Sequence, residues 1–241
     1  MKLTIFIACF NERPTILKTI EEAKQINIDK EIIVIDNCSA DGTREILEGL
    51  KNDKALKIIL HPKNMGSGYS ARECIQLAQG YYFYGPGADL EYKMDDVYKM
   101  MEKIEKEKLD AVFGSRLADR RGLSVWALIK ERPYWLGSII TTFLINLFYH
   151  RNFTDIIATK LTRTDILKGL DMQADNQGFE FELVSKLCKR GYKIGEIPVW
   201  YKPRTHKEGK TIRVTDIIPA LFAIFKIKFF IKLANAESNE A

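Results

Sequence analysis

The sequence has little of the cysteine and histidine from which zinc sites and disulfide frameworks are built. Its 241 residues contain four cysteines and three histidines, and no Cys-x-x-Cys pair. The four thiols are widely scattered, which argues against a metal cluster and against the disulfide framework of a small secreted domain. We therefore expect reduced thiols, as in the cytosol, at Cys9, Cys38, Cys74 and Cys188.

Long apolar runs are also lacking. The apolar stretch 136–149 is interrupted by polar residues and is shorter than the roughly 20 residues that span a bilayer. A second stretch, 217–233, carries Lys226, Lys228 and Lys232, which would be costly in a bilayer core. We expect both stretches to form helices that lie on a membrane surface, with the lysines toward the headgroups. Packing against the sheet or a second subunit is the alternative, and periodicity does not separate the two.

Basic residues outnumber acidic residues only slightly. The chain has 37 of the former and 32 of the latter, which gives a formal net charge of +5. Nucleic acid is not expected as a partner, because no recognised binding motif accompanies the charge. Basic residues gather between Arg190 and Lys232. This gathering suits phosphate-bearing ligands or an anionic membrane face, although a solvated surface has the same appearance.

Strand-like and helical stretches alternate over the first 116 residues. The strand-like runs are 3–9, 31–35, 56–60, 80–84 and 111–113, and the helical stretches between them are 14–25, 43–52, 68–78 and 95–108. This alternation predicts an α/β fold with a mostly parallel sheet flanked by helices and right-handed crossovers. The first strand begins at Leu3, which leaves no room for a signal peptide.

Two of the predicted strands stop at polar residues. The run 3–9 is followed by Asn11-Glu12, and the run 31–35 by Asp36-Asn37. In a βαβ unit the ligand crevice lies beyond the carboxyl ends of the strands. The sequence therefore predicts that Glu12 and Asp36 face one ligand pocket.

The two strand ends resemble the nucleotide-sugar-binding half of the family 2 glycosyltransferases, which have the Rossmann-like GT-A fold. Members open with a strand ending in Tyr-Asn-Glu and continue with Asp-Asp-x-Ser-x-Asp-Gly-Thr, where this chain reads Cys9-Phe10-Asn11-Glu12 and then Asp36-Asn37-Cys38-Ser39-Ala40-Asp41-Gly42-Thr43. A doubly wound protein with turn-forming Asp and Gly is the alternative. Asn64, Gly66 and the helix start after them fit the family's Asn-x-Gly-x-x-x-Ala. The resemblance implies a donor-binding set of Ala8, Phe10, Asn11, Glu12, Asp36, Ser39, Asn64, Gly66, Ala88 and Asp89.

The segment 85–92 resembles the family motif Asp-Ala-Asp-Leu-Glu, which holds a divalent ion. Mg²⁺ or Mn²⁺ needs only one or two carboxylates from the protein when phosphates supply the other oxygens. This chain has Gly87 in place of the first Asp. The resemblance therefore implies a weaker or differently arranged metal site on Asp89 and Glu91, with a catalytically weakened nucleotide-sugar-binding protein as an alternative.

The second half is similar to dolichol-phosphate mannose synthases and bacterial polyprenyl-phosphate glycosyltransferases, with a helix from residue 178 and a strand over 191–199. Gly114-Ser115-Arg116 matches their Gly-Ser-Arg, and Arg204 and Lys210 keep the spacing of their Arg-x-x-Gly-x-Ser-Lys. Over 155–161 only the Asp of Asp-x-x-Ser-Gly-Phe-Arg survives. The resemblance implies a catalytic set of Asp89, Arg116, Arg204 and Lys210, and an acceptor-phosphate set of Arg116, Arg132, Arg204 and Lys210. Exposed basic loops are the alternative.

The activity implied is the inverting, metal-dependent transfer of a sugar from a GDP- or UDP-sugar to a polyprenyl or dolichyl phosphate. It places the protein peripherally at the inner, cytoplasmic face of the membrane, with a homo-oligomer or a separate membrane-spanning partner left open. A phosphate acceptor needs no general base, because its second pKa is about 6. A non-lipid hydroxyl acceptor would need one, for which the candidates are Asp175, Glu180 and Glu182.

The domain organisation expected from the resemblance is one GT-A domain over residues 1–233. It comprises a nucleotide-sugar-binding half (1–116), an acceptor half (117–213) and an amphipathic helix (214–233). A disordered tail over 234–241 would follow, as its small and polar composition indicates.

Overall fold

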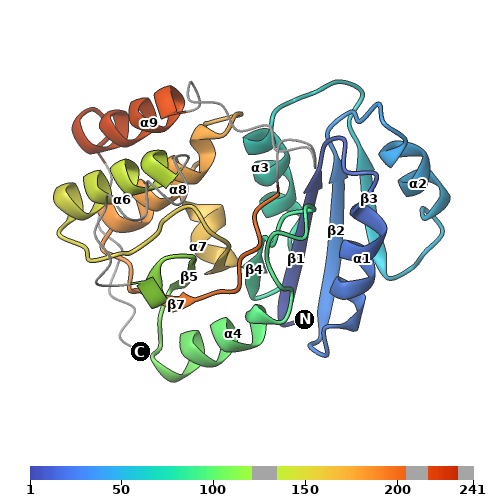
Figure 1. Ribbon diagram of the computed structural model, residues 1–241, viewed down its shortest axis with the longest axis horizontal. Coiled ribbons are helices and arrows are strands. Elements are labelled where there is room, and N and C mark those ends of the chain that lie inside the picture. Colours follow the sequence, from blue (N-terminus) through green and yellow to red (C-terminus); the bar gives the residue numbers. More distant parts are fainter. Residues whose placement is uncertain (121–134, 205–216, 233–241) are drawn as a thin grey trace.

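A seven-stranded sheet flanked by helices forms the centre of the computed structural model, which describes residues 1–120, 135–204 and 217–232 (Figure 1). The strands are β1 (Leu3–Cys9), β2 (Lys30–Asp36), β3 (Leu56–Leu60), β4 (Tyr82–Tyr84), β5 (Ala111–Ser115), β6 (Lys160–Arg163) and β7 (Ile194–Pro198). The helices are α1 (Ile16–Gln25), α2 (Thr43–Gly49), α3 (Ser67–Leu77), α4 (Asp96–Lys106), α6 (Trp135–Tyr149), α7 (Thr164–Gly169), α8 (Gly178–Lys189) and α9 (Ile217–Phe229), with a 3₁₀ turn at Ala118–Arg120. The predicted tail over 234–241 lies outside the described residues.

The sheet has the order β3-β2-β1-β4-β6-β5-β7, and all strands are parallel except β6. The predicted α/β class and mostly parallel sheet are confirmed. Strand β6, antiparallel to both β4 and β5, was not predicted from the sequence. Its four residues include Lys160 and Arg163, so it has no apolar run to indicate a buried strand.

Alternate residues of the central strands are buried in two separate hydrophobic cores, because successive side chains along a strand point to opposite faces of the sheet. Ile5 and Ile7 of β1 join the core beneath α1 and α4, whereas Phe6 joins the core formed with α3, α7 and α8. Strand β2 divides in the same way, with Val34 in the first core and Ile35 in the second. Burial on both faces explains why these strands read as continuous apolar runs.

Helices α6 and α9 lie beside α8, at the opposite end of the molecule from α1 and α2 (Figure 1). Helix α9 packs on α8 through Ala220, Ala223, Ile224 and Ile227. Helix α6 instead buries Ser138, Thr141 and Thr142 together with Trp135 and Ile145. Small polar side chains therefore occupy much of its inner face.

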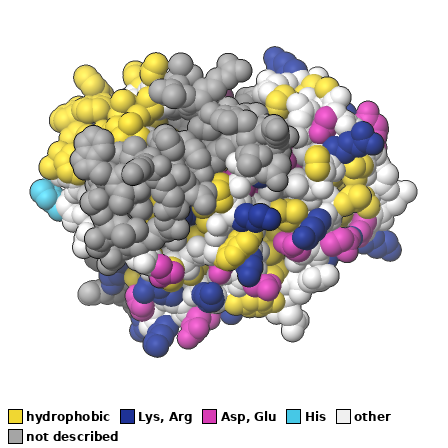
Figure 2. Space-filling view, viewed as in Figure 1, with side chains coloured by type: hydrophobic (Ala, Val, Ile, Leu, Met, Phe, Trp, Pro, Cys, Tyr) yellow, Lys and Arg dark blue, Asp and Glu magenta, His cyan; other side chains and the backbone are white. Residues whose placement is uncertain are grey.

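The opposite side of these two helices is apolar and exposed, up to 82% for Phe230. Figure 2 shows the resulting apolar surface at the upper left of the molecule. We call it the outer apolar face, and its residues are Phe143, Leu147, Ile218, Phe222, Phe225, Phe229 and Phe230. Each helix thus packs against the protein on one side and is exposed on the other, and attachment to a membrane stays a prediction. Within the described residues, no helix combines the length and hydropathy needed to cross a bilayer.

The lysines of α9 do not all point outward as predicted. The ammonium group of Lys228 donates to the carbonyl of Phe148, and it lies 5.1 Å from the centre of the Tyr149 ring. This lysine therefore ties α9 to α6. Lys226 and Lys232 are exposed, as expected.

Gly80, just before β4, allows a close approach to β1 that a side chain would prevent. A Cβ atom on Gly80 would lie 2.4 Å from the backbone of Leu3 and Thr4, whereas one on Gly49 would meet nothing within 4 Å. We expect Gly80→Ala to lower the free energy of unfolding by roughly 1–3 kcal/mol, as overpacking does. The control Gly49→Ala should be neutral or stabilising by up to about 1 kcal/mol. If the Gly80→Ala and Gly49→Ala variants unfold at the same urea concentration, Gly80 is not needed for the close approach of β4 to β1.

Candidate active site

The loops that follow β1 and β2 are joined by the polar residues of the two predicted motifs. The backbone N–H of Asn11 donates to Ser39 Oγ at 2.8 Å, and Asn11 Oδ1 accepts from the N–H of Ala40 at 2.9 Å. The N–H of Glu12 donates to Thr43 Oγ1 at 2.9 Å. Asn11 and Ser39, both predicted to bind the donor, therefore also hold the two strand ends together as one edge.

Asp36 is fully buried at the end of β2. Its carboxylate accepts from the N–H of Ser39 at 3.1 Å and pairs with Arg44 Nη1 at 3.3 Å. The same guanidinium nitrogen donates to the carbonyl of His61 at 2.8 Å, after β3. In this arrangement Asp36 positions the loops after β2 and β3. Its contact with a bound donor stays a prediction.

The turn that opens α3 is shaped by close backbone contact. Gly66 has φ +93°, and a Cβ atom there would lie 2.1 Å from the carbonyl oxygen of Asp175. A Cβ atom on Gly68 would lie 2.3 Å from the carbonyl oxygen of Ala174. The two glycines therefore seat the start of α3 against the segment that leads into α8. Asn64, also in the predicted donor set, accepts from the Asn37 amide at 2.9 Å.

Glu12, Asp89 and Glu91, which we call the carboxylate cluster, meet at Arg204 near the carboxyl edge of the sheet. Arg204 binds Glu12 through two parallel hydrogen bonds of 2.7 and 2.9 Å, and its Nη2 lies 3.6 Å from Asp89 Oδ2. The backbone N–H of Arg204 donates to Glu91 Oε1 at 2.8 Å. Such a fork-to-fork pair is among the stronger hydrogen-bonded contacts in proteins. The structure thus brings together four of the residues predicted from the sequence.

The protonation of the cluster reflects its crowding. Burial raises the pKa of Asp89, as does the neighbouring charge of Glu91, while Arg204 opposes both effects. Carboxylates that are crowded and partly desolvated favour a bound cation. No three His, Cys, Asp or Glu side chains within the described ranges are grouped to hold a metal ion by themselves. Asp89 and Glu91 nevertheless fit a divalent ion that takes its other ligands from phosphate.

Gly87, which replaces the first Asp of the metal motif, has φ +84°. Residues with a Cβ rarely adopt this conformation. A Cβ atom would also lie 3.3 Å from Asp89 Oδ1. The loop is therefore built around glycine, so an added Asp would be strained.

A pocket of about 250 Å³ begins beside Asp89 and runs between β1, β4, α3 and α8. Its wall contains Ala8, one of the predicted donor-binding residues, and the apolar side chains of Phe6, Ile75, Phe83, Phe179 and Leu183. Lys160 and Glu180 also line it, and their charged groups are 2.7 Å apart. Neither the pocket wall's aromatic character nor the role of Lys160 was predicted. The only signal was a lone lysine in a stretch that departs from the family motif.

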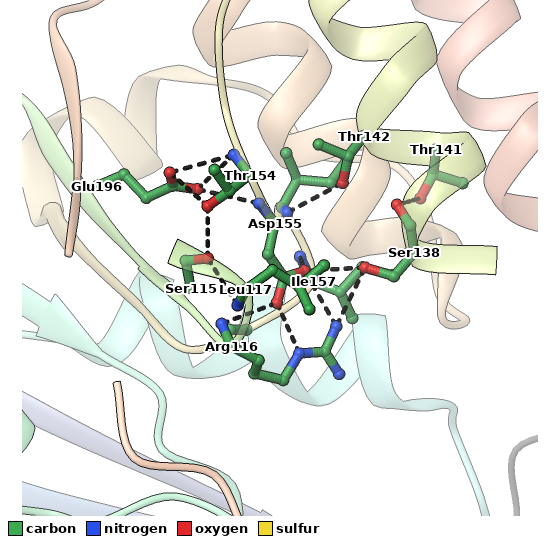
Figure 3. A network of polar contacts seen from close by, with 12 residues as sticks. Ser115, Arg116, Leu117, Ser138, Thr141, Thr142, Thr154, Asp155, Ile157 and Glu196 are labelled. Atoms are coloured by element: carbon green, nitrogen blue, oxygen red, sulfur yellow. Dashed lines mark hydrogen bonds and ion pairs between the residues drawn. The ribbon is translucent and has the colours of Figure 1, made fainter. Parts of the chain in front are cut away.

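Arg116 lies in a buried network around Asp155 (Figure 3). Its Nε is 2.6 Å from Asp155 Oδ2, its Nη2 is 3.0 Å from Oδ1, and Nη2 also donates to Ser138 at 3.1 Å. Burial alone would raise the pKa of Asp155, but the charge of Arg116 and the hydrogen bonds hold it below its usual value. The charge of Arg116 is thus balanced within the protein, and its binding of phosphate stays a prediction.

The remaining predicted residues are dispersed. Arg132 and Lys210 lie outside the described residues. Phe10 is exposed, and Ala88 is buried with its carbonyl accepting from Thr19 at 3.1 Å.

The three candidate bases have different surroundings. Asp175 pairs with Arg72. Glu182 is buried, where it pairs with Lys186 at 2.7 Å and accepts from the N–H groups of residues 173 and 174. Glu180 is the one of the three that lines the pocket.

The chain is similar to known glycosyltransferases along most of its length. The family model described as glycosyl transferase family 2 matches residues 4–170. The chain is 28% identical over 203 residues to glycosyltransferase AglJ of Haloferax volcanii, covering 83% of this chain and 63% of that protein. It is 23% identical over 218 residues to undecaprenyl-phosphate mannosyltransferase of Micrococcus luteus, covering 87% of each.

A solved structure of glucosyl-3-phosphoglycerate synthase from Mycobacterium tuberculosis, in complex with Mn²⁺, UDP and glucosyl-3-phosphoglycerate, is similar to this one. The TM-score is 0.63 at 15% identity, over 96% of this chain and 81% of that chain. This similarity confirms the predicted GT-A fold.

The Arg116–Asp155 pair gives a prediction for stability. Asp155→Ala leaves Arg116 buried without its carboxylate, so the free energy of unfolding should fall by about 3–5 kcal/mol. Glu107→Ala, which breaks the exposed Lys103–Glu107 pair of 2.7 Å, should cost less than about 1 kcal/mol. Because the folded-state pKa of Asp155 is lowered, its contribution is present near neutral pH and is lost as the pH falls through that pKa. Similar losses for the two variants in urea denaturation would refute this role.

Proposed function

The chain belongs to glycosyl transferase family 2, and on that premise we propose that this glycosyltransferase moves a hexosyl group from a UDP- or GDP-sugar to a polyprenyl or dolichyl phosphate. The observation that carries the proposal is the carboxylate cluster beside the pocket, with Arg204 bound to it. A diphosphate and its metal would meet the cluster, while the attached sugar would enter the pocket. Two similar proteins support the proposal. The structure of glucosyl-3-phosphoglycerate synthase contains Mn²⁺ and UDP, and the relative from Micrococcus luteus is an undecaprenyl-phosphate mannosyltransferase.

The metal would be held by Asp89 and Glu91. Once bound, Mg²⁺ or Mn²⁺ would neutralise negative charge on the departing nucleoside diphosphate. Arg204 offers a planar fork to Glu12, and a phosphate group accepts the same pair of hydrogen bonds. We therefore propose that Arg204 binds phosphate during the reaction, with Arg132 and Lys210 as further candidates.

The transfer would be one in-line displacement that inverts the anomeric carbon. A phosphate acceptor is already anionic near neutral pH, so the protein needs to position it and to compensate its charge rather than remove a proton. Arg116 would contribute chiefly by fixing the edge of the site, since Asp155 and Ser138 take its hydrogen bonds. A hydroxyl acceptor is the second candidate, because Glu180 lines the pocket and could serve as its base.

The outer apolar face would contact the lipid chain of the acceptor and the surrounding bilayer. Helix α9 begins beside the start of α8, where the carbonyl of Pro219 lies 3.5 Å from the Cβ position of Gly178. The next residue, Phe179, lines the pocket. A bilayer against the outer apolar face would thus bring lipid phosphates close to the pocket.

We propose peripheral attachment at the cytoplasmic face of the membrane. All four cysteines are free, which suits a reducing compartment. A second copy of the chain, or a membrane-spanning partner, would cover the same apolar side chains.

Asp89 provides the test of donor and metal binding. We expect Asp89→Asn to abolish Mn²⁺-dependent transfer and nucleotide-sugar binding, yet to raise the melting temperature at neutral pH. The raised folded-state pKa of Asp89 means that its ionised form destabilises the native state, and this penalty grows as the pH rises through that pKa. The amide lacks the penalty, so the gain should shrink in acid. Glu102→Gln, at an exposed position on α4, serves as control. Normal metal-dependent transfer by Asp89→Asn would refute the metal assignment.

Membrane attachment is tested on the outer apolar face. We expect the full chain to sediment with anionic phosphatidylglycerol vesicles, more weakly in high salt, because Lys226 and Lys232 each contribute roughly 1 kcal/mol. The triple variant Phe222→Ser, Phe229→Ser, Phe230→Ser should lose most of this binding, whereas Leu17→Ser, an exposed position on α1, should not. Substitution is preferable to truncation, since Ile224 of α9 belongs to the core. Absence of vesicle binding by the unaltered chain would favour a protein partner on this face.

A further inference from the structure

We infer that Lys160 and Glu180 recognise the sugar of the donor, and that they select a neutral hexosyl group. This inference deepens the proposed function and rests on it. It concerns a pair of residues that the family motifs do not assign. Over 155–161 this chain shares only the Asp with the motif of its relatives, and Lys160 lies within that stretch.

The position of Lys160 is unusual for a lysine. It begins β6, between β4 and β5, and its side chain is only 6% exposed. The ammonium group lies 2.7 Å from Glu180 Oε2, 3.0 Å from the carbonyl oxygen of Ala158, and 5.5 Å from the centre of the Phe113 ring. An ammonium group has three N–H donors, and these two oxygens accept two of them. Lys160 therefore has capacity for one more acceptor.

Stability alone does not account for this pair. Replacing a buried ion pair by apolar residues of similar size is often neutral or stabilising, because the charges lose their hydration. The surrounding pocket wall, with Phe6, Phe83 and Phe179, would accommodate an apolar residue well. A charged pair kept in an apolar pocket that opens to solvent is typical of a ligand-binding site.

The distribution of charge along the pocket indicates which part of the donor would meet the pair. Among the described residues that line it, Asp89, Lys160 and Glu180 are the charged ones. Asp89 belongs to the carboxylate cluster, where the diphosphate would bind. The sugar attached to that diphosphate would extend along the pocket wall toward Lys160 and Glu180. The carboxylate of Glu180, 47% exposed, would accept hydrogen bonds from sugar hydroxyls, and Lys160 would donate one.

The charge balance favours an uncharged sugar. Lys160 and Glu180 neutralise each other, so the pair offers no net positive charge to an anionic sugar. The carboxylate of a hexuronic acid would face Glu180 at close range and would compete with it for Lys160. Hydroxyl groups can bind the pair without separating it.

The test compares donors with and without their sugar. Binding of UDP, GDP, UDP-glucose, UDP-N-acetylglucosamine, GDP-mannose and UDP-glucuronate to the full chain with Mn²⁺ is measured by calorimetry. For the nucleotide sugar that binds tightest, we expect Lys160→Met and Glu180→Gln each to weaken binding about tenfold, as loss of a hydrogen bond to a charged group does. Binding of the corresponding nucleoside diphosphate should stay unchanged. Lys103→Met, in an exposed pair with the same 2.7 Å separation, is the control and should change neither.

The possible outcomes distinguish recognition of the sugar from other roles of the pair. Equal weakening of nucleotide and nucleotide sugar would overturn the inference in favour of a structural role for the pair. If Glu180→Gln binds the donor normally but fails to transfer, Glu180 is a general base and the inference is wrong. Tighter binding of UDP-glucuronate than of UDP-glucose would overturn the selection of a neutral sugar. If the unaltered chain binds none of these nucleotides, the proposed function itself fails. Because Glu180 is half exposed, its variant remains informative even if Lys160→Met does not fold.

Discussion

A carboxylate removed from water needs a cation or several hydrogen-bond donors, and this requirement shapes the carboxyl edge of the sheet. Four buried or half-buried acidic groups there are paired with basic residues from other parts of the chain. These ion pairs hold loops that the sheet itself does not fix. The pairs are Asp36 with Arg44, Asp155 with Arg116, Glu12 with Arg204, and Glu180 with Lys160.

Pairing across long sequence separations also explains where sequence analysis succeeded and where it failed. The strands β1 and β2 could be predicted because burial on both faces requires continuous apolar runs. The motif residues could be found because their order along the chain is fixed. The partner of Arg116 could not be found, since Asp155 lies 39 residues away and only the fold brings them together. The pairing of Asp36 with Arg44 was likewise not predicted from the sequence.

The glycines of the α3 turn show a second limit of sequence reasoning. From the sequence, Gly66 was assigned to donor binding. In the structure, Gly66 and Gly68 permit a close approach to the start of α3. The approaching group in the structure, however, is the backbone before α8. A glycine pattern in a sequence indicates that another group approaches the backbone closely, but it does not identify that group. Similarly, the apolar periodicity of α6 did not show which side faces inward. The small polar residues turn toward the protein because Ser138 donates a hydrogen bond to Asp155, which leaves Phe143 and Leu147 outside.

The contact between Arg204 and the carboxylate cluster means that the protein without substrate carries its own counterion. A divalent ion arriving at the cluster does not meet bare negative charge, because a guanidinium tethered to the same chain already neutralises part of it. Binding is then an ion exchange, in which the competing cation is present at the high effective concentration of any intramolecular group. A free metal ion would gain little binding free energy from such an exchange, because it would displace Arg204 from its anionic partners. A metal ion bound to a diphosphate would bring phosphate oxygens that can pair with the displaced arginine. If the proposed function holds, the order in which metal and nucleotide bind would be set by the Arg204 side chain.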